Sequence, residues 1–473
     1  SLLPRAVVCA LLIFGIFSSV VNAQLLPDTT GTAVQQPAPE IRHFSLTIDA
    51  AMLAEGAFQG TAQYHLQSQT DSLASLFLRA ANLEIQDASL QYADSTRILT
   101  NIRQGSGDSL IVPINQRVPT DTTVVLTIDY RGSPGPGIYT QVTSEDVLSA
   151  AWTSGVPHTN RFWFPTFERL DDRFSSELRV TLPAPLSVVA AGTHVSTTSP
   201  EEGTNSYLYR VEEPLPSSLL GFAAGSYENV RTSVQQQDGS SVILEYLVPP
   251  ERIGDARRTF RATPDAMRFL SDRLGVAYPW PIYRQAVVPG IRPARTHPPT
   301  TALLPDSLMV DQRAEVDFPA HYVVAYSLAH QWTGVMITPE SWADSWIQQG
   351  LSAYLAAEFL AETQGSDVGH LRLQQQEQEY LASRMAHRRA LAPSSWSAPA
   401  ELFAEGRAAK GARIFQMLER QMGADAFRAA LQELLSAYQF QTVSTTDIRE
   451  TFEEASGQSL DRFFDHWIYR AGH

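Results

Sequence analysis

A serine and a histidine three residues apart, Ser327 and His330, could take part in chemistry, and Asp344 follows shortly after them. Residues three apart on a helix lie on one face, so a serine activated by an imidazole that a carboxylate orients is one chemistry to weigh. A nucleophilic serine, however, sits on a strained turn with free backbone N–H groups, whereas a mid-helix serine is surrounded by amides that are already bonded. Small polar residues on helices mostly bond to their own backbone. We therefore do not expect a Ser/His/Asp hydrolase.

The segments around these residues share a longer pattern with a known family. Residues 326–332 read Tyr-Ser-Leu-Ala-His-Gln-Trp, and residues 342–350 read Trp-Ala-Asp-Ser-Trp-Ile-Gln-Gln-Gly. They resemble the gluzincin zinc aminopeptidases typified by aminopeptidase N, the membrane alanyl aminopeptidase family. In that family one helix carries His-Glu-x-x-His-Gln-Trp and a second carries Trp-x-Asp-x-Trp-Leu-Asn-Glu-Gly. Further matches follow in the family's order: Trp-Thr-Ser-Gly-Val-Pro at 152–157, Phe-Trp-Phe-Pro at 162–165, Tyr-Pro-Trp-Pro at 278–281, Lys-Gly at 410–411 and Phe-Phe-Asp-His-Trp at 463–467.

The resemblance implies where a zinc ion and its general base would be placed. A catalytic zinc takes three protein ligands and leaves one position for water, and a nearby carboxylate takes the proton of that water. The two histidine positions hold Tyr326 and His330, the general-base position holds Ser327, and the third-ligand position holds Gln349. Neutral tyrosine and glutamine are poor zinc ligands, and a serine hydroxyl is not a base near neutral pH. We therefore expect no cofactor, and we expect His330 to be a buried imidazole satisfied by hydrogen bonds.

The substrate-binding parts that the resemblance implies also differ. The family's loop that grips the substrate's α-amine through a glutamate corresponds to residues 290–305, which carry Arg292, Arg295 and His297 and no acidic residue. A second amine-binding acid corresponds to Val156, and the tyrosine that stabilises the oxyanion corresponds to Ala408. A basic loop repels an α-ammonium group. These cleft candidates predict a neutral-to-basic groove without preference for a free peptide N-terminus.

Together the substitutions predict a protein that keeps the scaffold without the reaction. We expect an exported pseudo-peptidase that is not an enzyme and that binds a peptide or protein partner or acts as a scaffold. One alternative is a zinc-dependent metallo-aminopeptidase with weak or altered activity, which would require a different alignment of the two helices. Another alternative is a structural subunit of an envelope assembly.

Hydrophobic periodicity divides the chain into two parts that would position these segments. From 41 to 235 apolar and polar residues alternate, as in residues 44–48, which is typical of half-buried strands. From 236 to 473 apolar residues recur at helical spacing, as in residues 427–438. We expect a multidomain α+β fold, with an antiparallel β N-terminal domain (41–235) like that of the family. A thermolysin-like, mainly α-helical peptidase domain (236–473) would follow it.

The N-terminal residues predict export. Arg5 precedes an apolar stretch, and Val-Asn-Ala stands before Gln24, so residues 1–23 have the pattern of a signal peptide. The stretch is shorter than the ~20 apolar residues of a spanning helix, so we expect no transmembrane anchor in the mature chain. Residues 24–40 read as a flexible tether. A periplasmic or extracellular location is the consequence.

Composition excludes two further classes of function. The chain has 35 Lys and Arg against 50 Asp and Glu, a net charge of -15, and no basic run, which excludes a nucleic-acid partner. Its single cysteine, Cys9, lies within the predicted signal peptide. We therefore expect neither disulfides nor thiolate chemistry in the mature chain.

Overall fold

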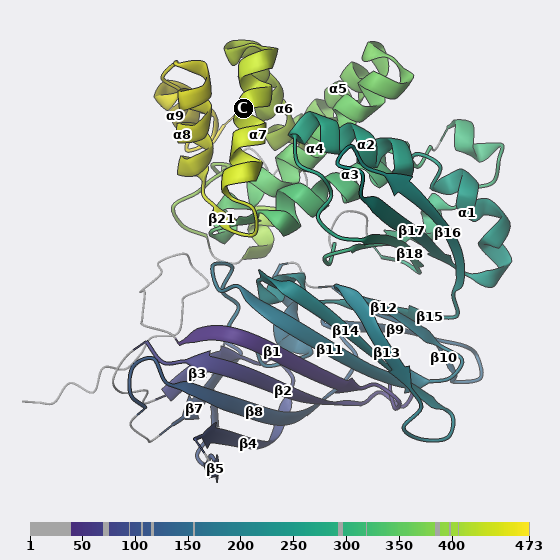
Figure 1. Cartoon of the computed structure of the whole chain (residues 1–473), viewed down its shortest axis with the longest axis vertical. Helices are drawn as coiled ribbons and strands as arrows, with labels where there is room; N and C mark the ends of the chain where they lie inside the picture. The colour runs from purple at the N-terminus through teal and green to yellow at the C-terminus, as the bar shows by residue number, and fades with distance from the viewer. Residues whose placement is uncertain are drawn as a thin grey trace, which may run out of the picture.

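A computed structural model describes residues 39–472 apart from 70–74, 94, 106, 115–117, 155–156, 292–296, 318, 384–387, 397–398 and 405. Figure 1 shows a body of strands below and a mainly helical body above, with the C-terminal helices at the top. The predicted fold class, a β-rich N-terminal part followed by a helical peptidase part, is confirmed. The predicted signal peptide and nearly all of the predicted tether lie outside the described residues.

The lower body contains one large sheet and two small ones. The large sheet has the order β13-β14-β11-β1-β2-β8-β4-β5, and all its neighbours are antiparallel except β1 and β11. Its strands are β1 (Glu40–Asp49), β2 (Phe58–Gln67), β4 (Glu84–Tyr92), β5 (Ser95–Ile98), β8 (Thr123–Gly132), β11 (Phe174–Pro183), β13 (Thr193–Thr198) and β14 (Thr204–Leu215). The second sheet, β12-β15-β10-β9, contains β9 (Ile138–Val142), β10 (Leu148–Thr153), β12 (Ser187–Ala190) and β15 (Phe222–Gly225). The third, β3-β7-β6, contains β3 (Ser75–Arg79), β6 (Arg103–Gln104) and β7 (Ser109–Pro113).

Because buried and less buried residues alternate along the strands, one face of the large sheet packs against the core. Phe44 on β1 and Tyr64 on β2 are paired in register, and their rings stack with centroids 4.3 Å apart. The hydroxyl of Tyr64 donates to the carbonyl of Pro165 at 2.5 Å, and that of Tyr130 donates to the carbonyl of Trp163 at 2.8 Å. Because buried hydroxyls need partners, these two bonds fix the segment that follows residue 162 against the sheet.

The upper body begins with a four-stranded sheet, β16-β17-β18-β19, in which only β16 and β17 are antiparallel. Its strands are β16 (Glu228–Gln235), β17 (Ser241–Val248), β18 (Ile282–Val288) and β19 (Thr301–Pro305). The boundary that we predicted between residues 235 and 236 falls in the turn of the β16–β17 hairpin. The polar turn residues there form the tip of a hairpin. The division of the chain into domains at this position stays a prediction.

Helices make up the rest of the upper body. They are α1 (Ile253–Thr259), α2 (Thr263–Leu274), α3 (His321–His330), α4 (Ser345–Gln364), α5 (Ser366–Ala382), α6 (Arg407–Met422), α7 (Ala424–Ala437), α8 (Thr445–Ser456) and α9 (Asp461–Trp467). A two-stranded pairing of β20 (Thr338–Pro339) with β21 (Thr442–Val443) joins the end of the α3 region to the start of α8. Within the described part of the chain, no helix is long and apolar enough to cross a membrane.

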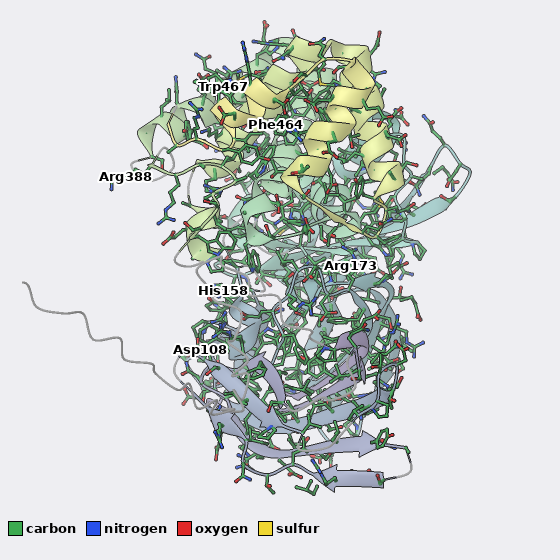
Figure 2. All side chains as sticks on the ribbon, turned by 90° about the vertical axis from the view of Figure 1, so that its left-hand side faces the viewer. Asp108, His158, Arg173, Arg388, Phe464 and Trp467 are labelled. Carbon is green, nitrogen blue, oxygen red and sulfur yellow. The ribbon has the colours of Figure 1, made fainter. Side chains whose placement is uncertain are left out.

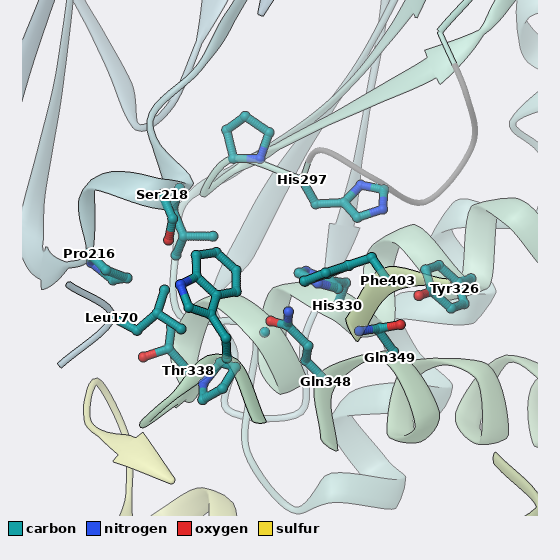
Figure 3. A pocket seen from close by; sticks show the side chains of 15 residues that line it. Leu170, Pro216, Ser218, His297, Tyr326, His330, Thr338, Gln348, Gln349 and Phe403 are labelled. Carbon is teal, nitrogen blue, oxygen red and sulfur yellow. The ribbon is translucent and has the colours of Figure 1, made fainter. Parts of the chain in front are cut away.

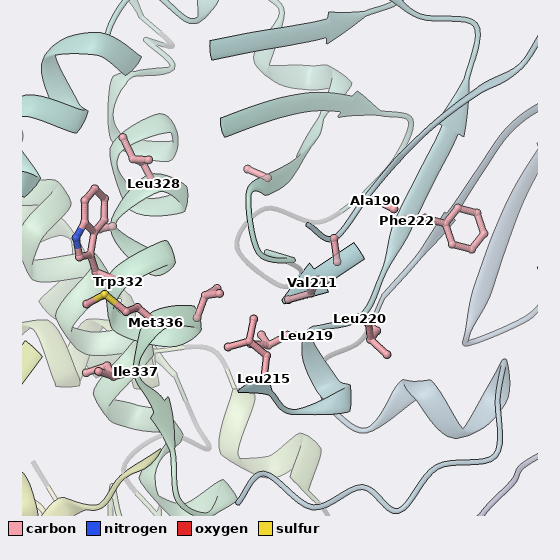
Figure 4. Close-up of a cluster of buried hydrophobic side chains, with 14 of the residues drawn as sticks. Ala190, Val211, Leu215, Leu219, Leu220, Phe222, Leu328, Trp332, Met336 and Ile337 are labelled. Carbon is pink, nitrogen blue, oxygen red and sulfur yellow. The ribbon is translucent and has the colours of Figure 1, made fainter. Parts of the chain in front are cut away.

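Buried apolar side chains join the two bodies. Figure 4 shows residues of the lower body facing residues of α3 and the turn after it. The labelled members from the lower body are Ala190, Val211, Leu215, Leu219, Leu220 and Phe222, and those from the upper body are Leu328, Trp332, Met336 and Ile337.

Polar contacts across the same junction fix the geometry. Arg173, labelled at the junction in Figure 2, donates through Nη1 to the Gln441 carbonyl at 3.1 Å and also to the Thr338 hydroxyl. On the other side Arg284 and Thr300 both donate to the Gly192 carbonyl, each at 2.9 Å. The segment that precedes β19 is therefore held between the two bodies, beside α3.

Candidate functional site

Helix α3 carries the predicted site residues on a fully buried segment. Its residues from Val324 to His330 are buried, and a π-helical turn, Gln331–Met336, continues it. The ring of His330 lies against Gly334, where an added Cβ would come within 2.3 Å of the ring. Gly334 therefore leaves the space that the imidazole occupies, and only a residue without a side chain fits there.

Asp344 has a structural role at the start of α4. Its Oδ2 accepts a hydrogen bond from the Ser341 hydroxyl at 2.6 Å in a capping box. Its Oδ1 accepts from the hydroxyl and the backbone N–H of Thr445 at 2.7 and 2.8 Å. Since both oxygens bind these partners, Asp344 orders the junction of α4 with α8 and does not orient His330.

A pocket lies where the two bodies meet at α3 and α4, with a cavity volume of about 30 Å³ (Figure 3). The residues that line it are Leu170, Pro216, Ser218, Leu219, His297, Pro298, Tyr326, His330, Gly334, Thr338, Pro339, Trp342, Gln348, Gln349 and Phe403. Three predicted positions, Tyr326, His330 and Gln349, thus line one pocket, and the cleft candidate His297 joins them. No aspartate, glutamate, lysine or arginine is among these lining residues.

The other predicted site residues do not line this pocket or cannot be placed. Ser327 is fully buried, and its Oγ has no hydrogen-bond partner within the described part of the chain. Ala408 lies in the first turn of α6 and is not among the lining residues. Arg292, Arg295 and Val156 lie outside the described residues. The roles that we predicted for individual residues stay predictions.

The two histidines of the pocket lie close together and are neutral. Their ring centroids are 4.9 Å apart, and His297 and His330 are 3% and 9% exposed. Burial lowers the pKa of His330 to about 4. Burial, and then the neighbouring His330, lower the pKa of His297 well below its ordinary value. Neither ring is therefore protonated near neutral pH.

Hydrogen bonding at these rings differs from our expectation of a satisfied imidazole. Nδ1 of His330 and both ring nitrogens of His297 are buried without a partner among the described residues. The neighbouring Gln349 is bonded, since it donates from Nε2 to the Leu402 carbonyl at 3.2 Å. The pocket thus holds three unbonded ring nitrogens on its two histidines.

The donor set at the positions implied by the resemblance does not fit a catalytic zinc ion by itself. Tyr326, His330 and Gln349 offer one phenol, one imidazole and one amide, whereas zinc sites use cysteine, histidine and carboxylate ligands. In the described ranges of the chain no three or more residues of those types cluster as a metal site would require.

Reasoning from the sequence missed the wall of the pocket that the lower body supplies. Leu170 and the segment from Pro216 to Leu219 line the pocket opposite α3 and α4. No spacing or motif links them to the two helices, because the contact arises only when the bodies dock. Gln348 and Trp342 could have been found, since they lie in the second motif segment beside Gln349.

Comparisons with known proteins agree on one family along most of the chain. The Peptidase M1 N-terminal domain matches residues 38–219, and the Peptidase family M1 domain matches residues 258–467. Aminopeptidase N of Streptomyces lividans is 25% identical over 357 residues, covering 72% of this chain and 40% of its own. Aminopeptidase M1-B of Oryza sativa subsp. japonica is 24% identical over 448 residues, covering 89% of this chain and 49% of its own. The chain thus spans less than half of the length of these two relatives.

Solved structures share the fold. Aminopeptidase A of Legionella pneumophila in complex with aspartic acid has a TM-score of 0.81 at 20% identity, covering 93% of this chain and 51% of that one. A mutant of the M1 zinc metallopeptidase from Deinococcus radiodurans, bound to a Tyr-Ser-Ala substrate, has a TM-score of 0.75 at 20% identity. That likeness covers 94% of this chain and 98% of the Deinococcus chain.

Two of our expectations from the sequence are contradicted by these comparisons. We expected the chain not to be an enzyme and to take no cofactor, but the matching relatives are named aminopeptidases and a structure of the same fold is a zinc metallopeptidase. The expectations rested on substitutions in the two helices and, for the enzyme, also on Ala408, Val156 and the loop at 290–305. That reasoning did not foresee that the fold brings a second imidazole, His297, beside His330.

Proposed function

Because the chain belongs to peptidase family M1, we propose that it binds peptides in the pocket between its two bodies and acts on them as a metallo-aminopeptidase with altered activity. The observation that supports this is the composition of the pocket: residues from both bodies and from the two motif segments converge on it, and none of the described lining residues carries a charged side chain. The relatives named aminopeptidases are about twice as long as this chain. Aminopeptidase activity of this chain is therefore part of the proposal.

The pocket walls suit the side chain of a peptide. Trp342 and Phe403 meet edge to face with ring centroids 5.8 Å apart, and Leu170 and Leu219 line the same pocket. Aromatic and aliphatic walls favour an apolar or aromatic side chain. The amides of Gln348 and Gln349 offer donors and acceptors for a peptide group.

The uncharged lining is the basis for calling the activity altered. A free α-ammonium that entered the pocket would lose its hydration without meeting a carboxylate among the described lining residues, which is unfavourable. A peptide whose N-terminus lies outside the pocket, or whose terminus is acylated, avoids this loss. Recognition would therefore depend on the side chain and the peptide group more than on the terminal charge.

Calorimetry on the full chain tests this proposal. The probes are the peptide Ala-Phe-Ala and its N-acetylated form, titrated with and without added Zn²⁺, with mass spectrometry of the products to detect cleavage. We expect the acetylated peptide to bind at least as tightly as the free one, and Trp342→Ala to weaken both by at least about tenfold. Tyr139→Ala, an exposed aromatic on the edge strand β9 and away from the pocket, is the matched control.

Two outcomes would overturn the proposal. If neither peptide binds the wild-type chain, the pocket does not take peptides. If acetylation abolishes binding, a charged anchor for the terminus exists and the pocket is not the binding site that we describe.

We further propose that the protein is exported, on the strength of the apolar stretch before Gln24. Expression of the chain with residues 1–23 retained, followed by N-terminal sequencing of the exported fraction, tests this. Cleavage after Ala23 is expected, and an uncleaved protein confined to the cytoplasm would contradict it.

A further inference from the structure

The sheet of the upper body has an open edge at β16. This strand is the outermost of the sheet β16-β17-β18-β19, and no other described strand pairs with its far side (Figure 1). Because β16 is antiparallel to β17, alternate residues direct their backbone N–H and C=O groups away from β17. An edge of this kind offers a row of hydrogen-bonding groups to another extended chain.

One backbone hydrogen bond identifies the residues that face outward. The Ile243 N–H on β17 is directed to the Pro281 carbonyl at 2.9 Å, on the side of β18. Ile243 is paired in register with Ser233 of β16, so this pair does not exchange hydrogen bonds between the two strands. Ser233 and its alternate neighbours Arg231 and Gln235 therefore direct their backbone groups to the open edge.

A second pocket lies against this edge, between β16 and α2, and we call it the edge pocket. The residues that line it are Val234, Gln235, Gln236, Gln237, Met267, Arg268, Ser271 and Asp272. Consecutive strand residues have side chains on opposite faces of a sheet, so a pocket that touches both Val234 and Gln235 lies at the rim of the sheet. Its cavity volume of about 170 Å³ far exceeds the ~10–15 Å³ that one water needs, which leaves room for a long side chain.

The lining of the edge pocket favours a side chain with an apolar stem and a cationic head. Val234 and Met267 are both buried and form an apolar floor. At the rim, Arg268 is already paired with Asp265 at 2.8 Å. Asp272, whose hydrogen-bond partner is a glutamine amide, forms no ion pair within the described part of the chain. A lysine or arginine can lay its methylene stem on the apolar floor and hold its charge beside this carboxylate.

We propose that β16 and the edge pocket bind an extended segment of a partner protein, which adds a strand to the sheet and inserts a lysine or arginine side chain into the pocket. In complexes of this kind main-chain hydrogen bonds supply affinity, and pockets for alternate side chains supply specificity. The net charge of -15 favours the approach of a basic segment. The edge pocket shares no described lining residue with the pocket between the two bodies, so the inference goes beyond the proposed function.

Binding of a synthetic strand to the full chain tests this site. The probe is a fluorescein-labelled, N-acetylated and C-amidated short peptide of alternating threonine and valine with lysine at its centre, and its counterpart carries glutamate there. We expect the lysine peptide to bind at least about tenfold more tightly than the glutamate peptide. Bound lysine peptide should also slow amide hydrogen exchange in fragments that cover residues 229–235, because their outward N–H groups become hydrogen-bonded.

Ser233→Pro is the decisive variant. Proline removes the outward N–H of residue 233 without removing a hydrogen bond to β17, so it blocks strand addition while the hairpin is kept. We expect a loss of at least about tenfold in affinity for the lysine peptide. The matched control, Ser233→Ala, keeps the N–H and should bind as the wild type does. Gln235→Pro serves if circular dichroism shows that Ser233→Pro does not fold.

A second pair of variants tests the pocket itself. Asp272→Asn should reduce the preference for the lysine peptide over the glutamate peptide, because it removes the carboxylate at the rim. Asp367→Asn is the matched control, since Asp367 is exposed on α5 and does not line the edge pocket.

Four results would contradict the inference. They are no binding of the lysine peptide to the wild-type chain, an affinity that the proline variants leave unchanged, and a lysine preference that Asp272→Asn leaves unchanged. The fourth is equal competition by lysine amide alone, which would show that the edge pocket takes a small cation and not a strand. Slowed exchange confined to α3 and α4 would place the peptide in the pocket between the bodies, and would likewise count against a site at β16.

Discussion

Gly350 on α4 and Gly411 on α6 touch through their backbones, directly beside the pocket residue Gln349. A Cβ added at Gly350 would lie 2.6 Å from the Cα of Gly411, and one added at Gly411 would lie 2.7 Å from the Cα of Gly350. Real Cβ atoms do not approach other atoms so closely, and no flexible side chain is present that could move away. The two glycines therefore set the distance between the helices.

Replacing either glycine with alanine is expected to destabilise the protein. For Gly350→Ala we expect a loss of about 1–3 kcal/mol or more, because overpacking at a rigid contact forces the helices apart. Thermal unfolding followed by circular dichroism measures the change. Gly254→Ala in α1 is the control, since an added Cβ there meets nothing within 4 Å and alanine favours a helix. Equal effects of the two substitutions would contradict the packing argument.

Two buried serines on adjacent helices are expected to respond to alanine in opposite directions. Ser327 on α3 has no partner for its Oγ among the described residues, whereas Ser352 on α4 donates to the Gln348 carbonyl at 2.7 Å. Ser327→Ala removes an unsatisfied hydroxyl and is expected to raise stability by up to about 1 kcal/mol. Ser352→Ala removes a bond and is expected to lower stability by about 1 kcal/mol. Urea unfolding of both variants decides, and destabilisation by Ser327→Ala would reveal a partner for that hydroxyl.

Periodicity and local motifs were sufficient to predict the order of the two parts of the chain. Helical spacing placed Tyr326 and His330 on one face, and the family motif placed Gln349 on the next helix. Both relationships are local or depend on a motif, and the three residues do line one pocket. The approach of His297 to His330 depends instead on how the segment before β19 is held by Thr300 and Gln331. That is a tertiary contact, which no pattern in either segment indicates.

For the same reason, the sequence did not indicate that the predicted domain boundary falls within a hairpin. Asp238 and Gly239 stand among polar residues, a composition that linkers and hairpin turns share. Pairing of β16 with β17 and of β17 with β18 decides that this turn belongs within the upper body. The pairing of strands that lie dozens of residues apart cannot be predicted from local composition.

Asp172, next to the arginine that joins the two bodies, is expected to make stability depend on pH. It is 7% exposed, its Oδ2 has no partner among the described residues, and burial raises its pKa to about 7. Because the pKa of Asp172 is higher in the folded chain than in the unfolded chain, the unfolded chain releases this proton at a lower pH. Stability from this group is therefore greatest below about pH 4 and falls as pH rises to about 7, by up to about 4 kcal/mol.

Asp172→Asn tests the direction in which stability changes with pH. We expect the variant to be more stable than the wild type at about pH 8 and nearly equal at about pH 4, because asparagine does not ionise. Asp171→Asn is the control: Asp171 is more exposed and pairs with Arg169 at 2.9 Å. Unfolding midpoints at both pH values measure the difference. A lower stability of Asp172→Asn at the higher pH would show that the carboxylate is stabilised in the folded protein.

A metal site is expected to form when two pocket residues are changed together. Tyr326→His with Gln349→Glu would place two imidazoles four apart on α3 and a carboxylate on α4 around one cavity, as in three-ligand zinc sites. We expect the double variant to bind Co²⁺ at least about tenfold more tightly than the wild type. Without metal it should be less stable, since the new carboxylate is buried in an uncharged pocket with no cation. Added metal should restore stability, because an ion that binds only the folded chain stabilises it.

Three comparisons make this last prediction specific. Tyr326→His with Gln348→Glu puts the same two groups into the pocket with the carboxylate one residue earlier on α4, and we expect it to gain less affinity. Adding His297→Ala to the Tyr326→His and Gln349→Glu pair should leave tight binding in place, because the rebuilt site does not use His297. The visible spectrum of bound Co²⁺ and the melting temperature with and without metal provide the measurements. Equal affinity of the Gln348→Glu and Gln349→Glu pairs would show that charge alone, without the geometry of the two helices, accounts for binding.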